Sequence, residues 1–378
     1  MPFYYRSHGK EAPNAFVAAV RRIYNPLGFQ RGYNFPLWII FGLGALGFCA
    51  SRAMYLDYDG TYKDGKQVTG DWESQSHGRW RVGMLMHLAA VIPIGFLLPF
   101  QFLPVIRYKF MLWHRLAGYV LMLLLLVGNV GACLVVDKAL GGSLEVRAIV
   151  YVLAGLTIVS LLLAYINIKR LQIDQHRAWM LRAWVYAFII VTQRLIQLPS
   201  MEIVSAMGVF YIPMKCHTID TILSLIQPNL AQVFYPQCAD SPDMTVAVLA
   251  NSYAEPNEQG IPPLHEIGAA VQATFGLSTL LALLLHIFGV ELYLHLTGAE
   301  AKRLKRVSRE RQLARGWSSS WLTKETWGDM GEEDGFDIKE KTVGNETAVM
   351  TASPNNAGSD SSLAQQKDVV TQQTTVTA

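Results

Sequence analysis

The sequence predicts an all-α membrane protein: a polytopic transmembrane helical bundle of six to eight spans with a disordered C-terminal tail. The first reason is composition, since 51% of the 378 residues are hydrophobic and only 16% are charged. Soluble domains carry about 25% charged residues. The second reason is distribution, because long apolar stretches alternate with short charged links, and the mean hydropathy is +0.23. These features exclude an ordinary soluble globule, and a net charge of +3 is too small to indicate a nucleic-acid partner.

A membrane-spanning helix needs about 20 mostly apolar residues. Residues 35–298 contain the segments that qualify, and we treat them as the transmembrane domain. The segments are Phe35–Met54, Val82–Ile106, Phe110–Val136, Val146–Ile168, Ala178–Leu198 and Ile267–Leu296. The first span follows a long basic N-terminal segment, residues 1–34, so we expect a retained span and not a cleaved signal.

Basic residues predict the orientation of the spans, because Lys and Arg accumulate in cytoplasmic links. They gather in residues 1–34, 107–115, 169–177 and 302–315, which are then all cytoplasmic if the number of spans is even. Both termini are therefore expected in the cytoplasm, with the endoplasmic reticulum as the expected membrane. The protein's expected partners are the lipid bilayer and a lipophilic molecule, described below.

The stretch between residues 199 and 264 then lies on the opposite side, although it is too apolar for a plain loop. Its segments Ser200–Pro213 and Thr218–Tyr235 are expected to be interfacial or re-entrant helices, or two further short spans. The first alternative gives six spans and the second gives eight. Cys216 and Cys238 fall in this stretch, and they form a bridge or stay free depending on whether it faces an oxidising lumen.

The C-terminal part changes composition twice. Residues 299–341 form a charged segment that is predicted to be cytoplasmic, first basic as far as Arg315 and then acidic. Residues 342–378 are rich in Ser, Thr, Gln and Asn and almost free of aromatic side chains. Such a composition cannot bury a core, so the tail is predicted to be disordered.

The fifth span carries a polar stripe. At about 100° per residue, Arg182, Tyr186, Gln193 and Gln197 fall on one face of a helix, with Arg194 beside them. Polar groups in a span must face the bundle interior or a water-filled cavity, and ionisable ones indicate function. The alternative is structural: Arg182 snorkels to the membrane surface and the glutamines tie helices together.

Glu202 follows the break expected at Pro199. A glutamate in apolar surroundings has a raised pKa and can act as an acid. Glu202 is therefore a candidate proton donor. The alternatives are a partner for Arg194 or an interfacial carboxylate that faces water.

His114 and His176 open the third and fifth spans at the same predicted depth. Two histidines at one depth on facing helices can ligate haem, and the alternative is a hydrogen-bonding or substrate role near the lipid headgroups. A second haem is poorly supported, because His87 has no partner at its depth except His265. Aromatic residues such as Trp179 belong to the interfacial belt, or they line a cavity where their rings stabilise a cation.

Two spaced clusters carry a resemblance to a known family. They are His114-Arg115-x-x-Gly118 and His176-Arg177-x-Trp179-Met180-x-Arg182, the second followed by Thr192-x-Arg194. The combination resembles a family of multi-spanning membrane proteins of unknown function from bacteria and filamentous fungi, over residues 82–200. More broadly, fungal proteins of this kind are similar to the membrane-bound terpene cyclases of meroterpenoid pathways, of the ascochlorin and macrophorin type.

The cyclase resemblance implies an isomerase of secondary metabolism that acts on a prenylated small molecule, with or without an epoxide. A buried acid would protonate the substrate, and the cation would cyclise among aromatic side chains and lose a proton. No cofactor or metal is expected, in agreement with the lack of an Asp-rich metal motif. The expected catalytic residues are Glu202 as the acid, Arg194 to orient it, and His176 and Arg182 at the inner end of the cavity. The expected substrate-binding residues are Gln193, Gln197, Tyr186, Trp179 and His114.

Two other functions stay open on the residues alone. One is a haem-b transmembrane electron-transfer protein that uses His114 and His176. The other is a non-catalytic transporter or scaffold in which the polar stripe lines a path. The cyclase hypothesis predicts that Glu202→Gln abolishes product formation while the protein stays in the membrane.

Overall fold

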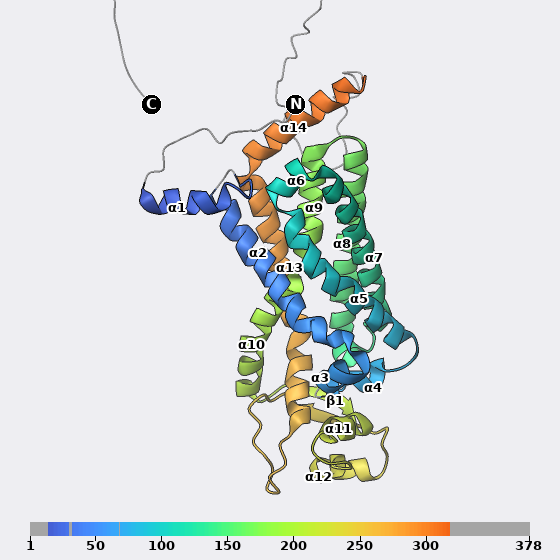
Figure 1. The fold of residues 1–378 in the computed structure, drawn as a ribbon. Helices are drawn as coiled ribbons and strands as arrows, with labels where there is room; N and C mark the ends of the chain where they lie inside the picture. The colour runs from blue at the N-terminus through green and yellow to red at the C-terminus, as the bar shows by residue number, and fades with distance from the viewer. Residues whose placement is uncertain (1–13, 30–31, 68, 318–378) are drawn as a thin grey trace, which may run out of the picture. The chain divides into compact units, whose positions relative to one another are not determined.

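The computed structural model describes residues 14–29, 32–67 and 69–317 (Figure 1). All of them lie in the first of the two units into which the chain divides, Met1–Asp329. The predicted acidic stretch that follows Arg315 and the predicted disordered tail, residues 342–378, lie outside the described residues.

Six helical segments in the described part of the chain are long and apolar enough to cross a membrane. This confirms the predicted helical bundle and fits the six-span alternative. The segments are α2 (Asn34–Arg52), α5 (Gly78–Gln101), α7 (Met111–Val135), α8 (Leu144–Lys169), α9 (Ile173–Ala187) followed by α10 (Ile189–Met207), and α13 (Leu264–Leu296). The protein is therefore an integral, multi-pass membrane protein.

The spans pack mainly in neighbouring pairs: α5 with α2 and α7, α8 with α9, and α10 with α13 (Figure 1). One buried cluster joins four spans, because Leu98, Leu121, Leu161 and Ala183 come from α5, α7, α8 and α9. Apolar side chains on the opposite faces stay exposed, such as Leu123 at 62%. In a membrane protein these faces contact lipid, so their exposure is expected.

Three further helices lie at one end of the bundle, which we call the α14 side. They are α1 (Ala15–Tyr24), α6 (Pro104–Lys109) and α14 (Gly298–Ala314). The basic helix α14 is bound to the start of α9: the Ser308 hydroxyl donates to Asp174 at 3.0 Å and accepts from the Ile173 amide at 2.9 Å. The Gln312 amide also donates to the Arg170 carbonyl at 2.8 Å.

The other end of the bundle is the disulfide side. The α2–α5 link there forms η1 (Ala53–Leu56), η2 (Tyr58–Tyr62), α3 (Lys63–Gln67) and α4 (Asp71–Gln75), and the α7–α8 link forms η3 (Ala139–Gly142). Tyr58 and Tyr62 both bond Gln75 through their hydroxyls, at 2.9 and 2.6 Å. Burial raises the pKa of Tyr58 to about 12, so its hydroxyl acts as a structural hydrogen-bond donor.

A small unit covers the disulfide-side end of α13. It contains β1 (Tyr211–Lys215), α11 (Cys216–Leu223), α12 (Ala231–Phe234), η4 (Pro236–Ala239) and β2 (Thr245–Leu249). The strands are antiparallel, with Tyr211 opposite Leu249. A disulfide joins Cys216 to Cys238, which settles the question that the sequence left open.

The structure corrects the expected end of the fifth span and the helix expected at Ser200–Pro213. Helix α10 continues through Pro199 to Met207, and the chain then enters strand β1. The Ser200 hydroxyl donates to the Ile196 carbonyl at 2.8 Å within the same turn. Serine groups of this kind help to accommodate proline in membrane helices. The true break of this span is at Phe188, between α9 and α10.

Candidate functional site

The polar side chains of α9 and α10 face α13, and we call this contact the α13 seam. The Arg182 guanidinium donates to both carboxylate oxygens of Glu291, at 2.6 and 2.8 Å. Farther along, the Gln197 amide donates to the Val271 carbonyl at 3.1 Å. Tyr186 is also buried. The predicted stripe thus lies inside the bundle, and it forms polar contacts with one neighbouring helix along much of its length.

His286 of α13 holds the break in this span. Its Nδ1 atom lies 2.7 Å from the Val185 carbonyl in α9, and its Nε2 atom lies 2.8 Å from the Thr192 hydroxyl in α10. A carbonyl can only accept, so Nδ1 donates to Val185, and the Thr192 hydroxyl, which can donate or accept, pairs with Nε2. His286 therefore links the two halves of the broken span.

His114 and His176 lie near one another on the α14 side. The Nδ1 atom of His176 is 2.9 Å from the Ala164 carbonyl, so that nitrogen is the donor and Nε2 is left for another partner. His114 is close enough to His176 and Arg107 for their charges to act on it. The Gln101 amide donates to the His114 carbonyl at 3.2 Å.

Four buried side-chain nitrogens on this side have no hydrogen-bond partner among the described residues. We call them the α14-side cluster: Arg107 Nε, His114 Nδ1, Asn167 Nδ2 and Trp179 Nε1. They come from α6, α7, α8 and α9. Trp179 lies one helical turn after His176 in α9. Asn167 lies one turn after Ala164 in α8, and the Ala164 carbonyl is the hydrogen-bond partner of His176. A buried donor without an acceptor costs about 1–3 kcal/mol, so four at one end of a bundle need an explanation.

The charges around the α14-side cluster are mostly positive. Burial lowers the pKa of the Arg107 guanidinium; Arg177 acts in the same direction and Glu300 opposes it. The Glu300 carboxylate accepts two hydrogen bonds from Arg303, at 2.9 and 2.6 Å. Arg177 donates to the Thr297 hydroxyl at 3.2 Å. Among the described residues, the Glu300 carboxylate bonds Arg303 and also acts on Arg177 and Arg107, so positive charge predominates around these two arginines.

The other predicted residues lie toward the disulfide side. The Arg194 guanidinium donates to Gln197 Oε1 at 2.6 Å, and the Gln193 amide donates to the same oxygen at 3.1 Å. Glu202 is exposed, and within the described part of the chain it forms no hydrogen bond or ion pair with Arg194. The apolar surroundings expected for a proton donor are therefore not present around Glu202.

The residues expected to share one cavity divide between two ends of the span. His176 lies on α9 and Glu202 on α10. At a rise of about 1.5 Å per residue, the two are about 39 Å apart along the broken span. A single small molecule cannot contact both, so His114, His176, Trp179 and Arg182 form one candidate site and Gln193, Arg194 and Gln197 form another.

Three residues of the first site were not among the predicted site residues. Arg107 was used only to orient the spans, Arg177 was also part of the second motif cluster, and Asn167 was expected only as a close-packing or hydrogen-bonding contact. The available signals were the position of Arg177 beside His176 and the proximity of Arg107 to His114 in the sequence. Arg107 is half-buried in α6, whereas Lys109 of the same helix is exposed.

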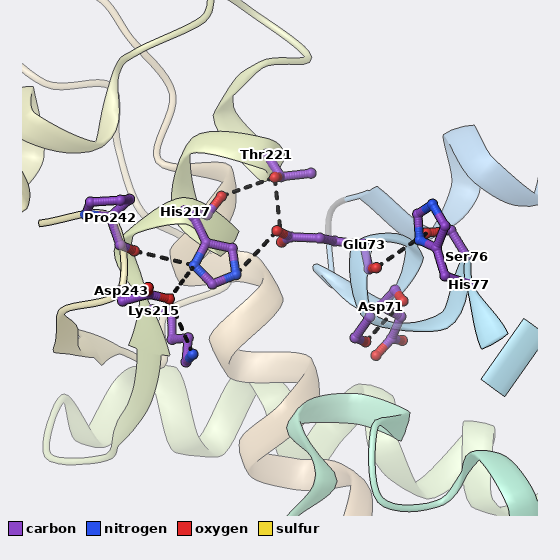
Figure 2. Close-up of polar contacts among 10 residues, drawn as sticks. Asp71, Glu73, Ser76, His77, Lys215, His217, Thr221, Pro242 and Asp243 are labelled. Atoms are coloured by element: carbon purple, nitrogen blue, oxygen red, sulfur yellow. Dashed lines mark hydrogen bonds and ion pairs between the residues drawn. The ribbon is translucent and has the colours of Figure 1, made fainter. Parts of the chain in front are cut away.

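A further polar cluster, on the disulfide side, has no counterpart in the sequence analysis (Figure 2). His217 of α11 places Nε2 3.1 Å from Glu73 Oε1 of α4, and its Nδ1 atom lies 3.2 Å from the Pro242 carbonyl. The Thr221 hydroxyl donates to Glu73 Oε2 at 3.4 Å. Figure 2 shows His217 between Glu73 and Asp243. The cluster connects the disulfide-bonded unit to the α2–α5 link, which is a structural role.

No group of three or more His, Cys, Asp or Glu side chains that could hold a metal ion occurs in the part of the chain that the structure describes. A bis-histidine haem needs only two ligands, so this finding does not decide the haem alternative.

Comparison with known proteins finds a match to a family described as "Predicted membrane protein (DUF2306)". No curated protein and no solved structure matches the chain. The match covers residues 84–218, from α5 to the start of α11, and includes both motif clusters and the whole broken span. Over these residues the chain is therefore similar to a family of multi-spanning membrane proteins of unknown function.

Proposed function

We propose that the protein binds a lipophilic small molecule from the bilayer and holds its anionic head group at the α14-side cluster. The observation that carries this proposal is the set of four buried, unpartnered nitrogens on four different elements, taken over the described residues. Oxygen atoms of a head group would accept hydrogen bonds from them.

Charge favours an anionic head group over water. Buried water could also satisfy unpaired donors. Water would not balance Arg107 and Arg177, which have among the described residues the charge of Glu300, a carboxylate already bonded to Arg303. Guanidinium groups bind carboxylates with strong, charge-assisted hydrogen bonds. A carboxylate head with an apolar tail therefore fits this end of the bundle, and a prenylated hydroxybenzoic acid has both parts.

The narrower proposal, which rests on the cyclase resemblance, is a proton-initiated cyclisation of the prenyl tail. We assign the proton to Nε2 of His176, because the Nδ1 atom bonds Ala164 and Glu202 lies at the other end of the span. An imidazolium is too weak an acid for an alkene, so the group protonated would be an epoxide oxygen. Opening of the epoxide forms the carbon–carbon bond, a neighbouring carbon loses a proton, and the product is an isomer of the substrate.

Binding can be measured by thermal unfolding of the full-length protein in detergent. The probe is 3-farnesyl-4-hydroxybenzoic acid, and its methyl ester is the uncharged control. Ligand at 100 times its Kd stabilises a protein by about 2.7 kcal/mol. We expect a clear rise in Tm with the acid and a smaller one with the ester.

The matched variants are Arg107→Gln and Lys109→Gln, which remove a half-buried cation with a buried Nε atom and an exposed cation from the same helix. Loss of a charged hydrogen bond of about 1.5–3 kcal/mol weakens binding more than tenfold, so Arg107→Gln should lose most of the shift. Lys109→Gln should keep it. Equal shifts for acid and ester, or for both variants, would refute the proposal.

Turnover is tested separately with membranes and the terminal epoxide of the same probe. We expect a product of unchanged mass from the wild type and from Glu202→Gln, and none from His176→Ala. Loss of product in Glu202→Gln would restore the original assignment of that residue. Binding without any isomer would end the cyclisation proposal and leave the binding proposal standing.

The second candidate is a haem-b site, favoured by the proximity of His114 and His176 on neighbouring elements. The arginines of the α14-side cluster would then bind the propionates. A visible spectrum of the purified protein, oxidised and then reduced, decides this. A haem band that disappears in His176→Ala would establish the site, whereas a colourless folded protein would exclude it.

A further inference from the structure

Two arginines on the disulfide side, Arg52 and Arg194, come from helices that are in contact, and the charge of Arg52 acts on Arg194. Arg194 of α10 donates from Nη1 to Gln197 Oε1 and packs 5.7 Å from the ring centre of Phe275. Its Nε atom is buried and has no hydrogen-bond partner among the described residues. The neighbouring Gln193 is fully buried, and its Oε1 atom has no partner there either.

Arg52 ends helix α2 on the same side. Its guanidinium donates to the Tyr55 hydroxyl at 3.3 Å and lies 5.4 and 5.5 Å from the ring centres of Tyr55 and Phe48. Helices α2 and α10 are in contact, and the charge of Arg52 acts on Arg194. Two cations near the edge of a membrane repel one another unless an anion lies close to them.

The carboxylate whose charge acts on Arg194 is that of Asp71, but it has other partners. Its Oδ1 atom accepts from the Leu140 amide at 2.8 Å, and its Oδ2 atom accepts from the Thr69 hydroxyl at 2.9 Å. Within the described residues, no Asp or Glu lies within ion-pair distance of Arg52 or Arg194. Hydrogen bonds from neutral donors leave the charge of Asp71 intact, so this carboxylate offsets part of the positive charge, and two guanidinium groups share one carboxylate among the described residues.

The position of the pair indicates where an anion would come from. Helix α2 begins at Asn34 and ends at Arg52, and α9 begins at Ile173. At about 1.5 Å per residue, Arg52 lies about 27 Å from the start of α2, close to the thickness of the hydrocarbon core. By the same rise, Arg194 lies about 32 Å from the start of α9 along the broken span. Both guanidinium groups thus reach the level at which lipid phosphates and dissolved anions meet the protein.

We propose that Arg52 and Arg194 form a binding site for a phosphate-type oxyanion at the disulfide-side edge of the bundle. Guanidinium groups match such anions because they donate two parallel hydrogen bonds. The Nε atom of Arg194 would supply one of these bonds. The anion is either free phosphate or the phosphodiester of a phospholipid, and the site is separate from the α14-side cluster.

The free-anion source is tested on the full-length protein in detergent, after delipidation. Tm is measured against sodium phosphate at constant ionic strength, with chloride as the other anion. We expect phosphate to raise Tm in the wild type, and the apparent affinity to fall at least tenfold in Arg52→Gln and Arg194→Gln. Arg79→Gln is the matched control, because Arg79 lies on the same side but is paired with Asp137 at 2.6 Å. It should respond like the wild type.

The lipid source is tested by native mass spectrometry before delipidation, with added phosphatidylglycerol as the probe. We expect the wild type and Arg79→Gln to retain lipid that both glutamine variants lose. If the glutamine variants do not fold, Arg52→Lys and Arg194→Lys replace them, because they keep the charge. We expect these lysine variants to bind phosphate and lipid more weakly than the wild type but still detectably. The proposal is overturned if phosphate and lipid binding are unchanged in all variants, or if the wild type binds neither.

Discussion

The close backbone approach between α5 and α7 gives a quantitative test of the fold. A Cβ atom added to Gly131 of α7 would lie 2.5 Å from the Gly83 carbonyl oxygen and 2.6 Å from the His87 amide nitrogen. Both are backbone atoms of α5, so they cannot rotate away as the end of a side chain can. Gly131→Ala must therefore push the two helices apart.

The expected magnitude combines two opposing effects. Overpacking a close contact costs about 1–3 kcal/mol. Replacing glycine by alanine within a helix gains about 1 kcal/mol. We expect Gly131→Ala to lower the free energy of unfolding by about 1–2 kcal/mol, because backbone shifts lie at the upper end of the overpacking range. Gly118 is the matched control on the same helix, since an added Cβ there meets no atom within 4 Å.

Unfolding in mixed micelles with increasing sodium dodecyl sulfate, followed by tryptophan fluorescence, measures the difference. Gly118→Ala should unfold at the wild-type midpoint or above it, and Gly131→Ala should unfold below it. Coincident midpoints for the two variants would show that α5 and α7 do not meet at Gly131, and the packing described here would then be wrong.

Three further outcomes are expected. Replacing Cys216 and Cys238 by serine should lower the stability of the small disulfide-side unit by about 3 kcal/mol, as expected for a loop of this length, and protease digestion should then cut the unit first. Burial opposes ionisation of Glu300, but the hydrogen bonds from Arg303 and the positive charges of Arg303, Arg177 and Arg107 together outweigh it, so the pKa of Glu300 is lowered. The stabilisation by that carboxylate is therefore present at neutral pH and lost as the pH falls through the lowered pKa; thermal unfolding should show Glu300→Gln less stable than the wild type at pH 7 but not at pH 3. Replacing His217 by alanine removes a half-exposed contact to α4 and should cost no more than about 1 kcal/mol, with faster hydrogen exchange in α11 as the measurement.

Hydropathy was sufficient to predict the spans because each depends on the composition of one continuous segment. The same reasoning failed beyond Leu198, where the packing of α10 and β1 decides the structure. Pro199 indicated a break, yet the helix continues through it. The strand that follows forms because Met214, Val246 and Val248 bury one face of a two-stranded sheet, and the strands that supply them lie far apart in the sequence.

The candidate site was predictable only in part, for a similar reason. The polar stripe of α9 and α10 could be found because helical periodicity places its members on one face. The α14-side cluster draws single residues from four elements, and periodicity within one segment cannot find it. Asn167 and Arg107 are ordinary residues in the sequence, and they become candidates because their nitrogens are buried without partners among the described residues.

The two charged ends of the bundle lie on the same broken span, which limits how they can influence one another. Arg194 of α10 lies about 27 Å from His176 of α9 along the helix axis, too far for a direct interaction between their ligands. A link between the ends must therefore pass the break at Phe188, where His286 bonds Val185 on one side and Thr192 on the other. The Thr192 hydroxyl can donate to Nε2 of a neutral ring or accept from Nε2–H of a charged ring, so this link is kept in both states. The contacts of His286 thus tie both helices of the broken span to α13 across the break.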